Sequence, residues 1–95
     1  MKTRVVHVKR DHYDIYAGRP SVLGNPFKIS EGRDRNGVIR DHKDWLEGRR
    51  FTDFQQGRRK KVLELIPSLK GKVLACWCKP QRCHCDTLAR MADKT

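Results

Sequence analysis

The chain has 95 residues, of which 22 are Lys or Arg and 11 are Asp or Glu, and its formal charge is +11. This length suits one domain with one modest hydrophobic core. No apolar run is long enough to cross a membrane or to serve as the hydrophobic region of a signal peptide. We therefore expect a cytoplasmic protein with no membrane partner.

The positive charge is unevenly distributed along the chain. Residues 48–85 carry ten basic and two acidic side chains, whereas residues 1–47 carry ten basic and seven acidic ones. A surface of one sign attracts polyanions, and nucleic acid is the commonest such partner. The charge favours a nucleotide or nucleic-acid ligand, although a solvated basic surface without a dedicated partner would have the same composition.

Two short strands are predicted near the beginning of the chain. Residues 4–8 are rich in β-branched side chains, and residues 13–17 form the second candidate. The second strand stops at a Gly-Arg-Pro-Ser tetrapeptide, residues 18–21, and Gly-Asn-Pro-Phe follows at residues 24–27. Glycines and prolines spaced so closely predict an ordered loop.

Two helices should follow this loop. Apolar side chains recur at helical spacing from Val38 to Leu46, and Gly48 closes that segment. The next helix has Thr52 as its predicted N-cap and Pro67 as its predicted end. The basic run at residues 58–61 lies on this helix, where a solvated face would explain it without a ligand.

A buried strand and a last helix complete the pattern. Residues 72–78 are a continuous apolar run that Pro80 ends, as expected of a strand buried on both faces. A short helix should begin near His84. The sequence therefore predicts a small single α/β domain over residues 1–95, with a short central sheet flanked by about three helices.

The cysteine segment is the predicted centre of the chemistry. All four cysteines fall between Cys76 and Cys85, too close together to staple a fold with disulfides. In α/β domains, ligands bind beyond the carboxyl ends of the strands, often at helix N-termini. The segment lies between a predicted strand and a predicted helix, where Lys79 and Arg82 should favour ionised thiols.

One interpretation of this segment is a zinc site. The spacing C-x-C-x4-C-x-C supplies the thiolates that Zn²⁺ prefers. Two cysteines one residue apart share a face on a strand but point about 200° apart on a helix, so the second pair converges only if Cys83 lies in the loop. The predicted ligands are Cys76, Cys78, Cys83 and either Cys85 or His84.

A second interpretation is a thiol-dependent enzyme. The stretch from Cys76 to Arg82 matches C-x5-R, the phosphate-binding loop of cysteine phosphatases, although it lacks glycines and Pro80 removes one N–H donor. Cys83, His84 and Asp86 are the predicted catalytic residues. The sequence leaves open whether the chain is an enzyme.

A third interpretation is a ligand pocket without metal. The helix N-terminus and Arg82 would bind a phosphate or carboxylate, and His84 and Asp86 would add polar or acid–base groups. The cysteines would then be mostly small buried side chains.

Several motifs, in their order along the chain, resemble those of the domain of unknown function 4326 family, which is common in bacteriophages and bacteria. The motifs are residues 15–21, residues 23–27, Trp45-Leu46, residues 69–78, Pro80, Cys83-His84 and residues 86–89. The resemblance spans most of the chain and implies a compact α/β domain of phage-type context. Cys85 and Arg82 depart from the family's usual residues, so a metal site that needs Cys85 or a C-x5-R loop would be particular to this chain.

The Gly-Arg-Pro-Ser and Gly-Asn-Pro-Phe loops form the other half of the predicted site. They should open at the same edge as the cysteine segment if the two strands are parallel neighbours. Arg19 would then face a phosphate, with Ser21 and Asn25 beside it. Alternatively, Arg19 pairs with an acid and Asn25 caps the loop.

The remaining rings are predicted to be structural. Trp45 and Trp77 follow core periodicity and should pack in the interior rather than stack on bases. His7, His12 and His42 should lie at the surface or at the edge of the core.

Our leading hypothesis is a pocket for a nucleotide-like or nucleic-acid ligand, with ligand-binding residues Arg19, Ser21, Asn25 and Arg82. The first alternative is a zinc-stabilised interaction module that binds a host protein. The second alternative is a thiol-dependent enzyme that acts on nucleosides or phosphates.

Overall fold

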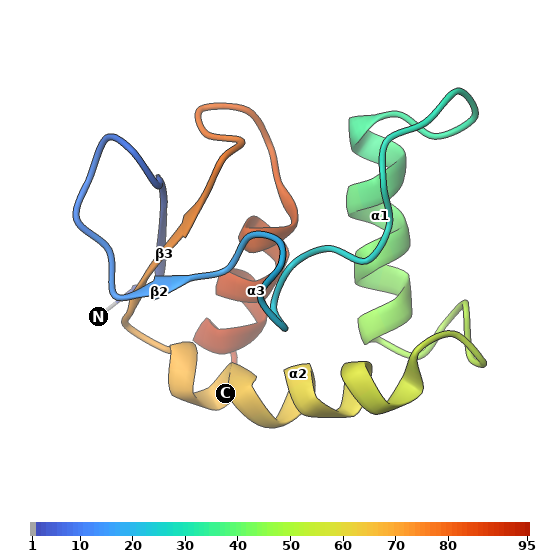
Figure 1. Cartoon of the computed structure of the whole chain (residues 1–95). Coiled ribbons are helices and arrows are strands. Elements are labelled where there is room, and N and C mark those ends of the chain that lie inside the picture. Colours follow the sequence, from blue (N-terminus) through green and yellow to red (C-terminus); the bar gives the residue numbers. More distant parts are fainter. Residues whose placement is uncertain (1) are drawn as a thin grey trace.

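The computed structural model describes residues 2–95. Its centre is a three-stranded parallel sheet in the order β1 (Arg4–His7), β3 (Val73–Cys76) and β2 (Ile15–Tyr16) (Figure 1). Val5 and Ile15 both pair with Leu74, so β3 lies between its two neighbours. The predicted α/β class is confirmed, and β2 and β3 are parallel neighbours.

Three helices accompany the sheet: α1 (Arg35–Leu46), α2 (Gln56–Leu69) and α3 (His84–Asp93). Helix α3 contacts both β1 and β3, and α1 and α2 pack against α3. Figure 1 shows α3 between the sheet and α1, with α2 running across the base of the molecule. None of the helices in residues 2–95 has the length and apolar character needed to cross a membrane.

The hydrophobic core forms where α3 meets the sheet and the other helices. Its fully buried large side chains are Trp45, Leu46, Leu69, Leu74 and Leu88. The indole N–H of Trp45 donates to the Phe54 carbonyl at 2.7 Å, so this polar atom is satisfied inside the core. The prediction that Trp45 packs in the interior is confirmed.

The basic run on α2 has two separate roles. Arg58 donates to the carbonyls of Ser21 and Gly24, and Arg59 donates to the carbonyl of Trp45. These arginines tie the loop after β2 and the end of α1 to α2. Lys60 and Lys61 are exposed, so only half of the run behaves as a solvated helix face.

Several predicted boundaries are wrong. Helix α2 begins at Gln56 and not after Thr52, because a turn closed by the bond from the Phe54 amide to the Phe51 carbonyl intervenes. Pro67 lies inside α2, which continues to the buried Leu69. A proline this close to the helix end removes a single helical hydrogen bond, and burial of the next turn compensates for that loss.

Two rings lie where the sequence did not predict them. Pairing with β1 ends at Cys76, so Trp77 leaves the sheet and is 55% exposed. His42 is only 1% exposed, because it faces inward on α1 and its ring lies 6.1 Å from Trp45 and 5.2 Å from His84.

Candidate functional site

The two halves of the predicted site meet at one edge of the sheet. Strands β2 and β3 are parallel, so the chain leaves both strands at the same edge, after Tyr16 and after Cys76. The first exit leads into the Gly-Arg-Pro-Ser loop and the second into the cysteine segment. This is the edge at which α/β domains place their ligands.

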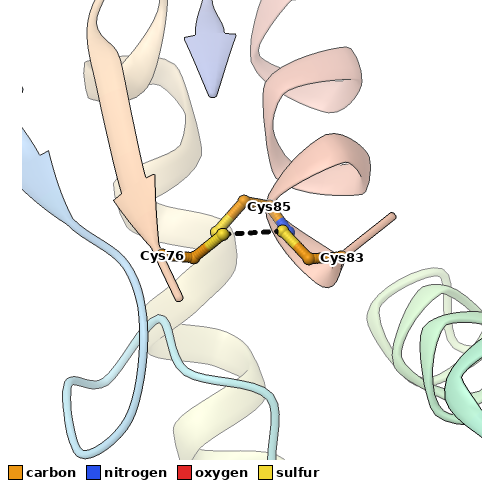
Figure 2. Close-up of side chains that lie close together, drawn as sticks. All are labelled: Cys76, Cys83 and Cys85. Atoms are coloured by element: carbon orange, nitrogen blue, oxygen red, sulfur yellow. Dashed lines mark hydrogen bonds between the residues drawn. The ribbon is translucent and has the colours of Figure 1, made fainter. Parts of the chain in front are cut away.

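Three cysteines from this edge form one buried cluster, which we call the cysteine cluster: Cys76, Cys83 and Cys85. Figure 2 shows the side chains pointing toward one another from the end of β3 and the first turn of α3. The sulfur atoms of Cys76 and Cys83 are 3.0 Å apart, and all three sulfurs lie within 4.8 Å of one another. None of the three forms a disulfide bond.

The start of α3 explains why these thiols converge. Cys83 is the N-cap of the helix in an extended conformation, with φ −150° and ψ 169°, so it lies outside the helical spiral that carries Cys85. Asp86 accepts a hydrogen bond from the Cys83 amide at 3.2 Å and completes a capping box. The sequence predicted that these thiols converge only if Cys83 lies in the loop before the helix, and the structure places it there.

Hydrogen bonds within the cluster shift the pKa values of its three thiols in different directions. Bonds from the thiols of Cys83 and Cys85 hold the pKa of Cys76 far below that of an ordinary cysteine. The same bonds to Cys76 raise the pKa of Cys83, and bonds to both partners raise the pKa of Cys85. Cys76 is therefore the thiol of this cluster that ionises most readily, with the other two placed to donate to it.

The donor set of the cluster fits a thiophilic metal ion. Zinc with Zn–S bonds of about 2.3 Å in a tetrahedral site separates its ligand sulfurs by roughly 3.8 Å. The three sulfurs lie within 4.8 Å of one another, close enough for all of them to reach one ion. Cys78 is half-buried and is not part of this cluster. The structure thus brings together three of the four predicted cysteine ligands.

A cleft of about 420 Å³ has Cys76 and Cys83 of the cysteine cluster in its lining and lies within the size range of small-molecule sites. Its walls come from the loop after β2, the first turns of α1 and the segment between β3 and α3. The lining residues are Gly18, Arg19, Asn25, Lys28, Ile29, Arg35, Val38, Ile39, Cys76, Trp77, Cys78, Arg82, Cys83 and His84. The cleft therefore joins both predicted halves of the site.

The lining of the cleft combines positive charge with exposed apolar surface. Four of its residues are cations, Arg19, Lys28, Arg35 and Arg82, and none of its described residues is acidic. Ile29 and Trp77 are 54% and 55% exposed, the highest values among the large hydrophobic residues of 2–95. Such a lining suits a ligand that carries both an anionic group and an apolar, planar group.

His84 connects the two loops that shape the cleft. Its Nε2 lies 2.8 Å from the Ala17 carbonyl and 3.0 Å from the Leu23 carbonyl, so this nitrogen carries the proton. Burial lowers the pKa of the ring, which favours the neutral form. In that tautomer Nδ1 holds the lone pair, and His84 positions the loop after β2 against α3.

The three ligand residues predicted in the two loop motifs after β2 have structural bonds. Arg19 donates from Nε to the Asn25 carbonyl at 2.9 Å, and Ser21 donates to the Gly18 carbonyl at 2.6 Å. Asn25 caps the loop, since its Oδ1 accepts from the Phe27 amide at 2.9 Å. Arg19 and Asn25 nevertheless line the cleft, whereas Ser21 does not.

Arg82 remains at the cleft, whereas Asp86 does not. Arg82 is exposed and donates to the side-chain oxygen of Asn36 at 3.0 Å. Asp86 pairs with Lys79 at 2.8 Å and faces a different depression. Of the predicted catalytic residues, the structure brings only Cys83 and His84 to the cleft.

The lining residues missed from the sequence include Lys28, Ile29, Arg35 and Trp77. Trp77 had a signal in its position, because it lies between Cys76 and Cys78 in the segment predicted to carry the chemistry. Lys28 and Ile29 directly follow the second loop motif. Arg35 had no signal, because only tertiary structure brings the start of α1 opposite these loops.

The comparisons with known proteins give a family and no activity. No curated protein and no solved structure matches the chain. The model of a domain of unknown function, DUF4326, matches residues 2–94. With nearly every residue covered by that match, the chain belongs to the DUF4326 family.

Proposed function

We propose that the cleft binds a nucleotide-like ligand. The observation that carries the proposal is the lining, in which four cations and no acid among the described residues surround a concave site at the carboxyl edge of a parallel sheet. Anions bind at this edge in many α/β domains. The guanidinium and ammonium groups would bind phosphate oxygens by charge-assisted hydrogen bonds.

The apolar part of the lining supports a base in addition to a phosphate. Trp77 and Ile29 are exposed at the cleft, although burial elsewhere would be favourable for both side chains. An aromatic face that accepts a stacked base contributes about 1–3 kcal/mol of binding energy. The phosphate and the base of a nucleotide would therefore both find matching side chains within the same cleft of about 420 Å³.

Isothermal titration calorimetry with adenosine and thymidine monophosphates tests this proposal. Lys28 is exposed and makes no ion pair within residues 2–95, so Lys28→Gln removes cleft charge without removing a structural bond. We expect affinity to fall about tenfold, or ~1.4 kcal/mol. Lys60→Gln, on an exposed part of α2 outside the cleft, is the matched control. Absence of binding, or equal losses in both variants, would refute the proposal.

A second candidate function is zinc binding by the cysteine cluster, and the three converging buried thiols favour it. Zinc held by Cys76, Cys83 and Cys85 would stabilise the junction of β3 with α3 and lower the pKa of its ligand thiols. A fold stabilised in this way is also what a module that binds a host protein would need. That partner stays a prediction.

Native mass spectrometry of protein purified under reducing conditions without chelator tests the zinc candidate. We expect one zinc ion per chain in the unmodified protein and none in Cys83→Ala. Cys78→Ala is the control, because Cys78 lies outside the cluster and its loss should leave the ion in place. A metal-free unmodified protein, or loss of zinc from both variants, would contradict the assignment.

A further inference from the structure

We propose that the nucleotide in the cleft belongs to a single-stranded nucleic acid, whose neighbouring phosphates follow a basic groove beside the cleft. This inference rests on the proposed function of the cleft and names the class of its ligand. It also assigns a second binding surface, which the cleft alone does not require.

The groove lies between α1 and α3 and measures about 820 Å³. Five of its lining residues are cations: Arg33, Arg40, Lys43, Arg82 and Arg90. Its two acids, Glu31 and Asp34, belong to the loop before α1, and Asp34 accepts a hydrogen bond from the Gly37 amide at 2.8 Å as the N-cap. The wall formed by the two helices is therefore positive.

The groove and the cleft are adjacent. Arg82 and Ile39 line both of them, so the two surfaces meet at these residues. Arg82 is held at this boundary, because it donates to Asn36 at 3.0 Å and its carbonyl accepts from Arg35 at 3.3 Å. A phosphate bound there would lie between the nucleotide in the cleft and the next phosphate in the groove.

Lys43 and Arg90 are the groove cations best placed to bind further phosphates. Arg33 and Arg40 share the buried carboxylate of Asp41, at 2.9 Å and 3.6 Å, and their charge is partly neutralised. Lys43 and Arg90 make no ion pair within residues 2–95. Lys43 lies in the last turn of α1 and Arg90 in the last turn of α3, so the two helices each contribute one of these cations to the groove.

The cleft favours a single strand over a duplex. A base can lie against Trp77 and Ile29 only if its face and edges are free, and bases in a duplex are stacked and paired. A duplex would need to flip a nucleotide out of its stack, which costs a few kcal/mol. A single strand offers unstacked bases and a flexible backbone that can turn from the cleft into the groove.

The test measures binding of thymidine monophosphate, of oligothymidylates of increasing length and of a short duplex, at low and at near-physiological salt. We expect affinity to rise with length until the groove is filled. Lys43→Gln/Arg90→Gln should lower oligonucleotide affinity about tenfold and reduce the slope of log K against log salt by about 1.4, or ~0.7 for each lost phosphate contact. Its affinity for the monophosphate should not change.

Lys60→Gln/Lys61→Gln is the matched control, because it removes the same charge from an exposed turn of α2 outside both surfaces. It should bind monophosphate and oligonucleotides within about twofold of the unmodified protein. Thermal unfolding of both double variants checks that they fold.

The outcomes separate the two proposals. If the monophosphate binds but longer strands bind no more tightly, the proposed function stands and the groove proposal is refuted. Equal losses in the two double variants, or a duplex that binds as tightly as a single strand, would also refute it. If neither monophosphate nor oligonucleotide binds, both proposals fail.

Discussion

The side chain of Asn25 joins the loop after β2 to the start of α1. It is buried, it accepts from the Phe27 amide at 2.9 Å, and it donates to the Val38 carbonyl at 3.1 Å. These bonds fix the wall of the cleft that carries Lys28. A motif residue predicted to touch the ligand thus acts mainly by positioning the residues that can do so.

Asn25→Ala should lower the free energy of unfolding by about 1–3 kcal/mol, because the Phe27 amide would lose its partner inside the protein. Urea denaturation measures the change. Ser21→Ala is the control and should lose less than about 1 kcal/mol, since the Gly18 carbonyl still accepts from the Ser21 amide at 2.9 Å. Equal stability of Asn25→Ala and the unmodified protein would contradict this role.

His42 makes the stability of the protein dependent on pH. Burial, followed by the nearby His84 and Arg58, lowers the pKa of its ring well below 6.5. Between the folded and unfolded pKa values the unfolded chain binds more protons, so stability rises with pH in this window. The contribution is fully present above about pH 6.5 and is lost as the pH falls below that value.

We expect the free energy of unfolding to fall between pH 7 and pH 5 by up to about 1.4 kcal/mol per pH unit for this proton. Urea denaturation at several pH values measures the slope. His42→Phe keeps a ring against Trp45 but has no titrating group, so its slope should be shallower. An identical pH dependence in both proteins would exclude His42 as the source.

At the scale of the element, the first turn of α3 supplies most of the architecture of the site. Its N-cap carries Cys83, its first two residues carry His84 and Cys85, and its third residue is Asp86. Asp86 bonds to the Cys83 amide and to Lys79, outside the cleft. We therefore expect Asp86 to stabilise the turn and not to act on the ligand.

Asp86→Ala should lower the free energy of unfolding by about 0.5–2 kcal/mol, the usual range for loss of a helix cap. It should leave the affinity for monophosphate within about twofold once folded protein is compared. Asp11→Ala, an exposed acid in the loop after β1, is the control for the change in charge. Loss of binding at unchanged stability would instead give Asp86 a role at the ligand.

The helices and strands were largely predictable because each has a local signal. Alternating or continuous apolar runs indicated the three strands, and α3 begins at the predicted His84. Errors arose where tertiary contacts override local preference. Pro67 is retained in α2 because the following Leu69 is buried, and the start of α2 is delayed by a turn that Thr52 does not reveal.

At the scale of the whole molecule, the fold turns scattered basic residues into two connected surfaces. The basic run of α2 is the densest group of positive charge in the sequence, yet Arg58 and Arg59 use their guanidinium groups to donate to backbone carbonyls. The cations around the cleft come instead from loops and helix ends far apart in the chain. Charge counted along a sequence therefore predicts a polyanionic partner but not the surface that would bind it.

The place of the cysteine segment at the edge of the sheet was predictable from the sequence, but the set of cysteines that converge was not. The parallel sheet brings the segment beside the Gly-Arg-Pro-Ser loop, as expected for adjacent strand ends. Which thiols converge depends on the extended conformation of Cys83, which no local pattern specifies. Exposure of Trp77 depends on where pairing with β1 ends.

The most direct test of the central claim, that the cleft binds a nucleotide, is an NMR titration of ¹⁵N-labelled protein with a nucleoside monophosphate. The two indole N–H signals serve as reporter and internal control. Trp77 lies at the cleft and donates to the Tyr16 hydroxyl at 3.0 Å, whereas Trp45 is buried and donates to the Phe54 carbonyl. We predict saturable shifts of the Trp77 indole and of the amides that line the cleft, with the Trp45 indole unchanged. An unchanged chemical shift of the Trp77 indole N–H, or shifts centred on Lys60 and Lys61, would contradict the claim.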